Sequence, residues 1–293
     1  MKKLIEKAEI LIEALPYIKK FYGKTFVIKY GGAAQTKSAL KDAFAQDVVL
    51  LNYIGINTVI VHGGGPKISE IMKKMGKTPT FIHGQRVTDR ETIDIVEMVL
   101  GGLINKEIVT LINRHGGKAV GLTGKDADLI RASKKVIKRP SPETGTDEII
   151  DLGLVGEVQE VTPDVLVGLK QNGFIPVVAP VGASAERETL NINADYVAAS
   201  LASALKAEKL ILMTDVPGIL DRKGEIFSTV KKKNLKKLFD DGTISGGMIP
   251  KVQACVEVLK SGVGKTHILD GRVPHCLLLE IFTEEGIGTE IIR

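Results

Sequence analysis

A repeated succession of buried strand, glycine turn and helix constrains the fold of this 293-residue chain more than any other feature. Two such units follow one another near the N-terminus, with strands at 25–30 (TFVIKY) and 58–62 (TVIVH), glycine turns at 31–32 and 63–65, and helices at 38–53 and 66–75. Pro66 suits the start of the second helix, where no backbone N–H is needed. Parallel strands joined by helices form a sheet covered on both faces, so the pattern predicts an α/β fold with a mostly parallel sheet.

The rest of the chain continues this alternation without an internal repeat or a low-complexity linker. Apolar periodicity predicts further elements: a helical stretch over 89–113, a short strand near 119–122, hairpin-like strands between 129 and 159, buried strands at 174–181 and 209–213, a helix at 247–260 and a strand at 266–269. The lysine-rich run 231–237 precedes Leu238 and Phe239 and reads as the solvated face of a helix. Chain length fits two domains or one large α/β unit.

The N-terminal segment predicts a separate amphipathic helix. Apolar residues recur at alternating spacings of four and three, at Leu4, Ala8, Leu11, Leu15 and Ile18. Pro16 is expected to bend or end this helix. The stripe packs either on the chain's own core or on a neighbouring subunit, and the pattern does not decide between them.

Composition excludes several classes of protein. No apolar run approaches the ~18 residues of a membrane-spanning helix, and Glu6 and Lys7 interrupt any signal-peptide core, so a cytoplasmic protein is expected. Cys255 and Cys276 lie in no metal-binding or disulfide spacing and are expected to be buried thiols. The net charge of +5 comes from scattered lysines and only 4% of residues are aromatic, which disfavours nucleic acid as a partner.

Charged residues beside the glycine turns indicate where the chemistry lies. Lys29 is the penultimate residue of a buried strand, Lys251 lies one turn into the helix after Gly247, and Asp195 opens another helix. A buried ammonium is costly unless an anion meets it, and helix-opening glycines present N–H groups to anions. Taken alone, a glycine at such a turn is equally well explained by the conformational freedom that the turn requires. Since neither the Rossmann nor the P-loop fingerprint is present, the two lysines, the aspartate and the glycine amides together predict another kind of phosphoryl-transfer site.

Six segments carry a resemblance to the amino acid kinase family: VIKYGG (27–32), VIVHGGGPKI (59–68), RVTD (86–89), NINAD (191–195), TDVPGIL (214–220) and GGMIPK (246–251). They follow the family's order, and weaker matches extend to both ends of the chain. The resemblance implies a three-layer αβα sandwich on one continuous sheet. It implies an oligomerisation helix over 1–21, an acceptor-binding lobe over 22–182 and a nucleotide-binding lobe over 183–293.

Within that family the chain resembles the arginine-sensitive members that use ATP to phosphorylate the side-chain carboxylate of N-acetyl-L-glutamate, in the second step of arginine biosynthesis. By this resemblance Lys29 and Lys251 stabilise the moving phosphoryl group, and Asp195 holds both lysines. Gly31, Gly32 and Gly64 donate N–H bonds to its oxygens. The acceptor is already a carboxylate at pH 7, so no general base is required.

The resemblance also implies how the substrates are held. Arg86 grips the α-carboxylate of the acceptor, and Gly64, Gly65 and Asn191 bind its main part. From the residues alone, a surface salt bridge of Arg86 with Asp89 or Glu91 is the simpler interpretation. The nucleotide's adenine and ribose contact three residues that otherwise read as an ordinary turn: Thr214, Asp215 and Gly218. Mg²⁺ is held mainly by the ATP phosphates, so no protein metal ligand is expected.

Both chain ends resemble those of arginine-inhibited members. There, N-terminal helices interlace three homodimers into a hexamer, and arginine binds beside that helix. The residues that match the effector site are Tyr17, Glu280, Gly286 and Gly288. A PII-type regulatory partner is an analogy that no residue supports. Two other functions stay open: a carboxylate kinase with a different acceptor, and a non-catalytic arginine sensor.

Overall fold

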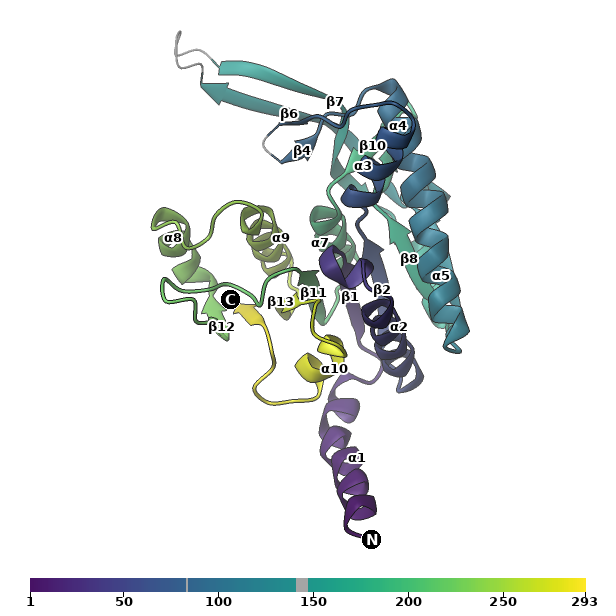
Figure 1. Ribbon diagram of the computed structural model, residues 1–293, viewed down its shortest axis with the longest axis vertical. Coiled ribbons are helices and arrows are strands. Elements are labelled where there is room, and N and C mark those ends of the chain that lie inside the picture. Colours follow the sequence, from purple (N-terminus) through teal and green to yellow (C-terminus); the bar gives the residue numbers. More distant parts are fainter. Residues whose placement is uncertain (83, 141–146) are drawn as a thin grey trace.

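The computed structural model describes residues 1–82, 84–140 and 147–293 (Figure 1). Its helices are α1 (Lys2–Phe21), α2 (Ser38–Tyr53), α3 (Gly65–Lys74), α4 (Arg90–Glu97), α5 (Asn105–Arg114), α6 (Asp164–Gln171), α7 (Ala194–Ala204), α8 (Lys232–Asp240), α9 (Met248–Lys260) and α10 (Cys276–Ile281). Short helical segments are η1 (Gly32–Gln35), η2 (Met98–Ile104) and η3 (Asp126–Asp128).

One eight-stranded sheet runs through the molecule in the order β12-β14-β13-β11-β1-β2-β8-β5. Its strands are β1 (Thr25–Tyr30), β2 (Asn57–His62), β5 (Ala119–Thr123), β8 (Ile175–Ala179), β11 (Lys209–Thr214), β12 (Thr229–Lys231), β13 (Lys265–Asp270) and β14 (Thr289–Ile292). All neighbouring pairs are parallel except β13 and β14. Every residue of β1 and β11 is buried, as expected for central strands of a sheet covered on both faces.

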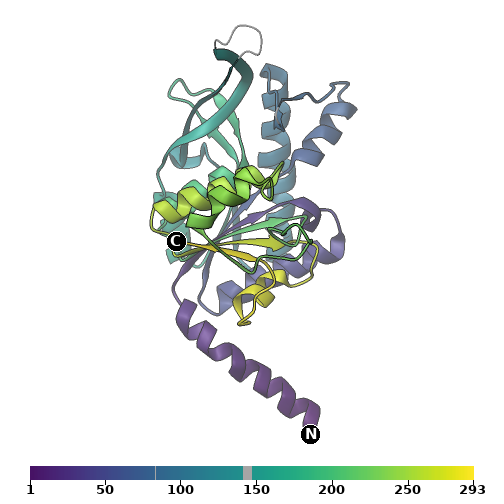
Figure 2. The ribbon, with the colours of Figure 1, turned by 90° about the vertical axis from the view of Figure 1, so that its left-hand side faces the viewer.

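Helices cover both faces of this sheet. Helices α7 and α9 pack on one face, and α2, α5 and α10 pack on the other (Figure 2). The layers and the mostly parallel sheet confirm the predicted three-layer sandwich, and the sheet is continuous from one side of the molecule to the other.

A smaller β layer sits above the carboxyl ends of the central strands. It contains β6 (Ile130–Pro140), β7 (Asp147–Val161), β9 (Val181–Ala183) and β10 (Thr189–Ile192), and the β6–β7 hairpin extends as an arm (Figure 1). A two-stranded piece, β3 (Phe81–Ile82) and β4 (Gln85–Arg86), lies near it. The predicted hairpin-like strands are therefore present.

The predicted strand 174–181 is divided in the structure. Its main part is β8 of the large sheet, and its last residue, Val181, begins β9 of the smaller layer.

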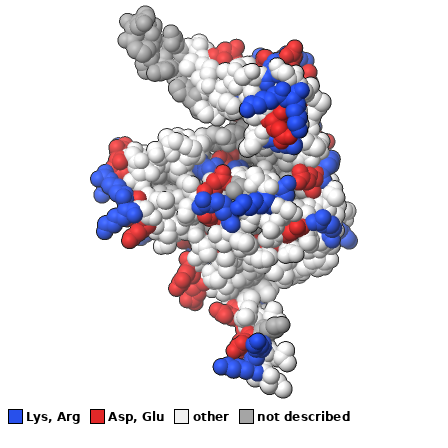
Figure 3. All heavy atoms as spheres, viewed as in Figure 1, with Lys and Arg blue, Asp and Glu red and all other residues white. Residues whose placement is uncertain are grey.

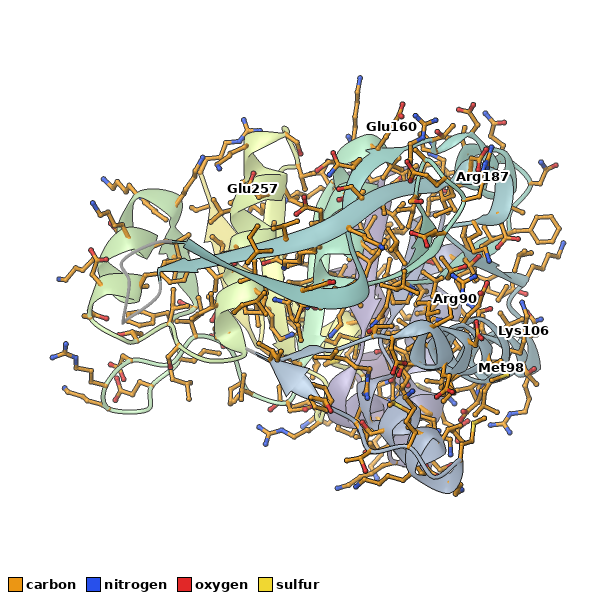
Figure 4. The ribbon with its side chains drawn as sticks, turned by 90° about the horizontal axis from the view of Figure 1, so that it is seen from above. Arg90, Met98, Lys106, Glu160, Arg187 and Glu257 are labelled. Atoms are coloured by element: carbon orange, nitrogen blue, oxygen red, sulfur yellow. The ribbon has the colours of Figure 1, made fainter. Side chains whose placement is uncertain are left out.

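The predicted helical stretch 89–113 is one continuous rod of three parts: α4, the π-helical η2 and α5. Arg90, Met98 and Lys106, one residue from each part, lie close together on the side of the molecule away from Glu257 of α9 in the view from above (Figure 4). The wider π turn coincides with Gly101 and Gly102, which place no side chain in the turn. Asp89 caps the rod, since its Oδ1 accepts the Thr92 N–H at 2.8 Å.

Helix α1 continues five residues beyond Pro16, so of the two expected effects of this proline, a bend or an end of the helix, the second is wrong. Only its last turns touch the body: Phe21 is buried, and the Tyr17 ring meets the Phe282 ring edge to face at 6.3 Å. The first turns extend away from the sheet (Figure 2), and Leu4 and Leu11 are 63% and 72% exposed. The apolar stripe of α1 therefore does not pack on the chain's own core.

Candidate active site

A cavity of about 660 Å³ opens at the carboxyl ends of β1 and β2, where parallel α/β sheets bind ligands. Its walls come from the loop after β1, the loop after β2, the helical rod η2–α5, Arg86 of β4 and the segment Asn191–Asp195. Figure 3 shows the surface hollowed between the β6–β7 arm and the side of the molecule that carries α8 and α9. The cavity contains the predicted residues Lys29, Gly31, Gly32, Gly64, Gly65, Arg86, Asn191 and Asp195.

Three charged side chains that are far apart in the sequence meet at the edge of this cavity. The Asp195 carboxylate lies between two ammonium groups, with Oδ1 3.2 Å from Lys29 Nζ and Oδ2 2.8 Å from Lys251 Nζ. Asp195 occupies the first turn of α7, where its position is fixed by Asn193 Oδ1 accepting the Asp195 N–H at 2.8 Å. The side chains of Lys29, Lys251 and Asp195 are only 10%, 15% and 6% exposed.

The cluster carries more positive than negative charge in a place shielded from water. Burial would raise the pKa of Asp195, but the positive charges of Lys29 and Lys251 hold it below its ordinary value. Burial lowers the pKa of Lys29, and the nearby Lys251 adds to this effect, while Asp195 opposes it. One carboxylate for two ammonium groups leaves a net charge of about +1, so the cluster attracts an anion in the cavity.

Glycines allow close approaches at three positions of the two loops, and at Gly32 the left-handed backbone also favours glycine. A Cβ on Gly31 would lie 2.6 Å from Lys29 Nζ, and one on Gly32, at φ +66°, would lie 2.0 Å from Asp215 Oδ1. A Cβ on Gly64 would collide with Ile104 and Leu100 of the rod. The glycines therefore let charged groups and the rod approach the backbone closely, and they leave backbone N–H groups accessible to a ligand.

Arg86 is a buried guanidinium that no carboxylate neutralises within the described residues. Nη2 donates to Gly65 O at 2.9 Å and to Ser69 Oγ at 2.8 Å, and the group stacks on the Phe81 ring at 4.7 Å. Burial lowers the pKa of Arg86.

The simple salt-bridge interpretation of Arg86 is wrong. Asp89 and Glu91 both pair with Lys77, at 2.8 Å each. Arg86 thus provides a second cationic position in the cavity, suited to a carboxylate.

Asn191 and Gly65 line the same cavity as Arg86, and the Gly65 carbonyl accepts from Arg86 Nη2 at 2.9 Å. Asn191 Nδ2 donates to Thr88 Oγ1 at 3.3 Å, which orients the amide from β10. Gly65 is the first residue of α3, and a Cβ there would meet open space. The cavity therefore has room and polar groups between the Arg86 guanidinium and the lysine cluster.

The three residues expected to meet the nucleotide do not line the cavity. Thr214 ends β11, and its carbonyl accepts the Gly271 N–H at 2.8 Å. Gly218 lies against Thr289, whose Oγ1 accepts the Ile219 N–H at 2.8 Å. Asp215 instead approaches Gly32, and its charge opposes the fall in the pKa of Lys29. Asp215 thus lies beside the glycine loop that follows β1.

A second cavity, of about 320 Å³, lies between the end of α1 and the C-terminal segment. Its walls include all four residues expected to bind an effector: Tyr17, Glu280, Gly286 and Gly288. Glu280 accepts hydrogen bonds from His267 Nδ1 at 2.6 Å and from the Ile287 N–H at 2.8 Å. Burial would raise the pKa of Glu280, but His267 holds it below its ordinary value.

Several lining residues escaped the sequence interpretation. Gln35 reaches both glycine loops, and Lys41 and Glu107 form an ion pair at the cavity rim. His62 lies fully buried behind the loop after β2. A buried histidine in a strand reads as ordinary core, so no pattern in the sequence would have found it.

Two features are absent from the described residues. Across 1–82, 84–140 and 147–293, no group of three His, Cys, Asp or Glu side chains is arranged to hold a metal ion. No helix in those ranges combines the length and the apolarity that crossing a membrane requires. Cys255 and Cys276 are buried free thiols, as expected.

Known proteins resemble this chain along its whole length. Residues 24–270 match the family described as the amino acid kinase family. A protein named acetylglutamate kinase from Sulfurihydrogenibium sp. (strain YO3AOP1) is 57% identical over 297 residues, covering 99% of both chains. Another with the same name, from Syntrophobacter fumaroxidans, is 58% identical over 290 residues, covering 99% of this chain and 97% of the relative.

Solved structures give the same fold. The N-acetylglutamate synthase from Neisseria gonorrhoeae, in complex with coenzyme A and N-acetyl-glutamate, superposes with a TM-score of 0.80 at 26% identity. The match covers 98% of this chain, which spans 63% of the synthase's length. A carbamate kinase from Giardia superposes with a TM-score of 0.66 at 17% identity, covering 92% of this chain and 99% of the other, and shares the fold.

Proposed function

This chain belongs to the amino acid kinase family, and on that premise we propose that it transfers the γ-phosphoryl group of ATP to the side-chain carboxylate of N-acetyl-L-glutamate. The products are ADP and N-acetyl-L-glutamyl 5-phosphate, and the reaction is the second step of arginine biosynthesis. Full-length relatives named acetylglutamate kinase support this substrate. The observation that carries the proposal is Arg86, a buried guanidinium in the cavity for which the described residues provide no carboxylate.

Phosphoryl transfer requires that negative charge be stabilised as it moves between oxygens. We assign this to Lys29 and Lys251, which Asp195 holds at 3.2 and 2.8 Å. Asp195 keeps the two ammonium groups close together in spite of their repulsion, so little reorganisation is needed during the reaction. The attacking carboxylate is already deprotonated at pH 7, so the reaction needs no general base.

The acceptor is held at its other end. Arg86 offers a planar fork for the α-carboxylate, while Gly65 and Asn191 contact the rest of the molecule. ATP approaches from the side of β11, with Thr214, Asp215 and Gly218 at its nucleoside. The amides of Gly31, Gly32 and Gly64 meet the phosphates, and Mg²⁺ is carried by those phosphates. In this scheme residues 22–182 form the acceptor lobe and residues 183–293 the nucleotide lobe.

We also propose that arginine inhibits the enzyme from the second cavity. Glu280 supplies a buried carboxylate for a guanidinium, and Tyr17 of α1 lies at the same cavity. The exposed apolar stripe of α1 supports pairing with the same helix of another dimer, which gives a trimer of dimers through residues 1–21.

An acyl-phosphate trap tests the reaction. Hydroxylamine converts the product into a hydroxamate, and Mg-ATP is supplied with N-acetylglutamate, glutamate, aspartate or N-acetyl-aminoadipate, each with and without arginine. We expect hydroxamate from N-acetylglutamate, suppressed by arginine. Product from a different acceptor would assign another carboxylate kinase activity, and no product with any acceptor would favour a non-catalytic arginine sensor.

Deletion of residues 1–20 tests the regulation separately. We expect sedimentation to change from a hexamer to a dimer and inhibition by arginine to disappear, while the kinase reaction remains. An unchanged oligomer with unchanged inhibition would refute this role of α1.

A further inference from the structure

A buried polar chain lies directly behind the glycine loop that follows β2. His62 is the last residue of β2 and is fully buried, and its Nδ1 lies 3.1 Å from the carbonyl oxygen of Gly63. On the other side of the ring, Nε2 lies 3.2 Å from Asn105 Nδ2. The described residues thus connect the first residue of α5 to the glycine loop through one imidazole.

The surroundings of Asn105 determine which way its amide points. Nδ2 lies 2.9 Å from Val177 O and 3.3 Å from Leu122 O, and both carbonyls can only accept. Oδ1 accepts from Lys106 Nζ at 3.3 Å. The side facing His62 is therefore the NH₂ group and not the oxygen. Its two hydrogens are shared among Val177 O, Leu122 O and His62 Nε2, and an NH₂ group opposite Nε2 requires that this ring nitrogen carry no proton.

This arrangement selects one tautomer of His62. Burial lowers the pKa of His62 to about 4, so the ring is neutral at pH 7 and carries one proton. Because Nε2 accepts from Asn105, the proton is on Nδ1, and Nδ1 donates to Gly63 O. A backbone carbonyl cannot donate, which agrees with the same assignment.

The Gly63 carbonyl has a second donor. Gln35 Nε2 lies 3.4 Å from Gly63 O and 3.1 Å from Tyr30 O, and the Gly63 N–H also donates to Tyr30 O at 2.9 Å. Gln35 thus joins the loop after β1 to the loop after β2. With donors on both lone pairs, the carbonyl of Gly63 has a fixed direction.

The direction of that carbonyl determines the direction of the next amide. In a planar trans peptide, the C=O of Gly63 and the N–H of Gly64 point in opposite directions. The carbonyl points to the buried ring of His62, so the Gly64 N–H points away from it, and Gly64 lines the cavity. Gly64 is also the residue that precedes α3, so the partial positive charge of the helix N-terminus adds to that of the amide.

We propose that His62 is a positioning residue for phosphoryl transfer: its Nδ1–H, with Gln35, holds the Gly63–Gly64 peptide so that the Gly64 N–H meets the moving phosphoryl group. Asn105 supports this role by fixing the tautomer. The inference rests on the proposed kinase reaction, because the donor is useful only where negative charge develops. An ordinary structural histidine would contribute to stability without a selective effect on the transition state.

Two substitutions of His62 separate these roles. His62→Asn keeps an N–H donor near the place of Nδ1, whereas His62→Gln keeps a polar group near Asn105 and loses that donor. We expect His62→Gln to lower kcat by about 10- to 100-fold and to leave KM for both substrates unchanged. The loss is at most that of removing an oxyanion donor, because the Gly64 N–H is misdirected and not removed. His62→Asn should retain most of the wild-type kcat.

A binding measurement gives a readout besides turnover. ADP, aluminium fluoride and N-acetylglutamate together imitate the transferring phosphoryl group, and ADP alone does not. We expect His62→Gln to weaken the fluoride complex by the same factor as kcat, with the affinity for ADP unchanged. Gln35→Met should act in the same direction and decides the matter if His62→Gln does not fold. Gln159→Met, whose amide bonds Ser133 on the β6–β7 hairpin, is the matched control.

The outcomes are distinguishable. If the wild-type chain forms no product from N-acetylglutamate, the proposed function fails. If the wild type is active but His62→Gln and His62→Asn are equally impaired, or if only KM or the melting temperature changes, the positioning role of His62 is refuted.

Discussion

Replacing Asp195 by Asn tests the charge cluster most directly, because the side chain keeps its shape and loses only its charge. Lys29 and Lys251 lie 3.2 and 2.8 Å from its oxygens. At an effective dielectric constant of about 20, each attraction amounts to about 5–6 kcal/mol before desolvation is subtracted. Breaking a buried ion pair by removing one partner costs about 3–5 kcal/mol, so we expect the free energy of unfolding of Asp195→Asn to fall by about that amount at pH 7.

The pH dependence of this loss has a definite sign. The pKa of Asp195 is lowered in the folded state, so the carboxylate contributes stability above its unfolded pKa of about 3.9, and this contribution is lost as pH falls through the folded value. The stability difference between wild type and Asp195→Asn should therefore be constant above about pH 5 and shrink below about pH 4. Urea denaturation at pH 2.5, 3.5 and 7 measures it.

Activity should depend on pH in the opposite direction. Burial already lowers the pKa of Lys29, and Asp195 opposes that fall. Without the carboxylate the pKa of Lys29 falls further, so the variant should lose kcat as pH rises, at a lower pH than the wild type does. Asp94→Asn, an exposed carboxylate of α4, is the control. A variant with wild-type stability and a wild-type kcat profile would refute the reasoning.

Three further substitutions test other parts of the structure. Arg86→Lys keeps the charge but not the fork, so KM for N-acetylglutamate should rise by about 10- to 100-fold in steady-state kinetics with kcat nearly unchanged; a fall in kcat alone would contradict the assignment. Burial raises the pKa of Asp47 to about 6, so wild-type stability falls as pH rises from about 4 to 6, and Asp47→Asn should be more stable by about 2–3 kcal/mol at pH 8 but not at pH 4, as urea denaturation would show. Gly64→Ala places a Cβ 2.4 Å from Ile104 Cδ1 and should lower stability by about 1–3 kcal/mol in thermal melts, whereas Gly65→Ala meets open space and should not.

The elements that the sequence predicted correctly are those whose signal is local. Apolar runs, consecutive glycines and Pro66 predict the βα units around β1 and β2. The missed strands are short and depend on distant partners: β12 (Thr229–Lys231) pairs with β14 (Thr289–Ile292), sixty residues away. A three-residue strand has no periodicity of its own, so only the pairing defines it.

The site shows the same division. Lys29, Asp195 and Lys251 stood out because each charge lies beside a glycine turn or a helix start, and the structure brings them together. The roles of Gln35 and Asp215 depend on where two loops meet in space. Asp215 follows β11, but its carboxylate approaches Gly32, which follows β1, the neighbouring strand. The spacing of residues along the sequence does not predict this contact, because it depends on β1 and β11 being neighbours in the sheet.

The location of Lys29 has a consequence for how the enzyme loses activity. It stands on β1, which is buried throughout and hydrogen-bonded to β2 on one side and β11 on the other. Such a strand opens only when the whole domain opens, so its amides should be among the slowest to exchange with deuterium. Inactivation by denaturant should then coincide with global unfolding, and no partially opened form would leave the rest of the protein intact while disabling this lysine.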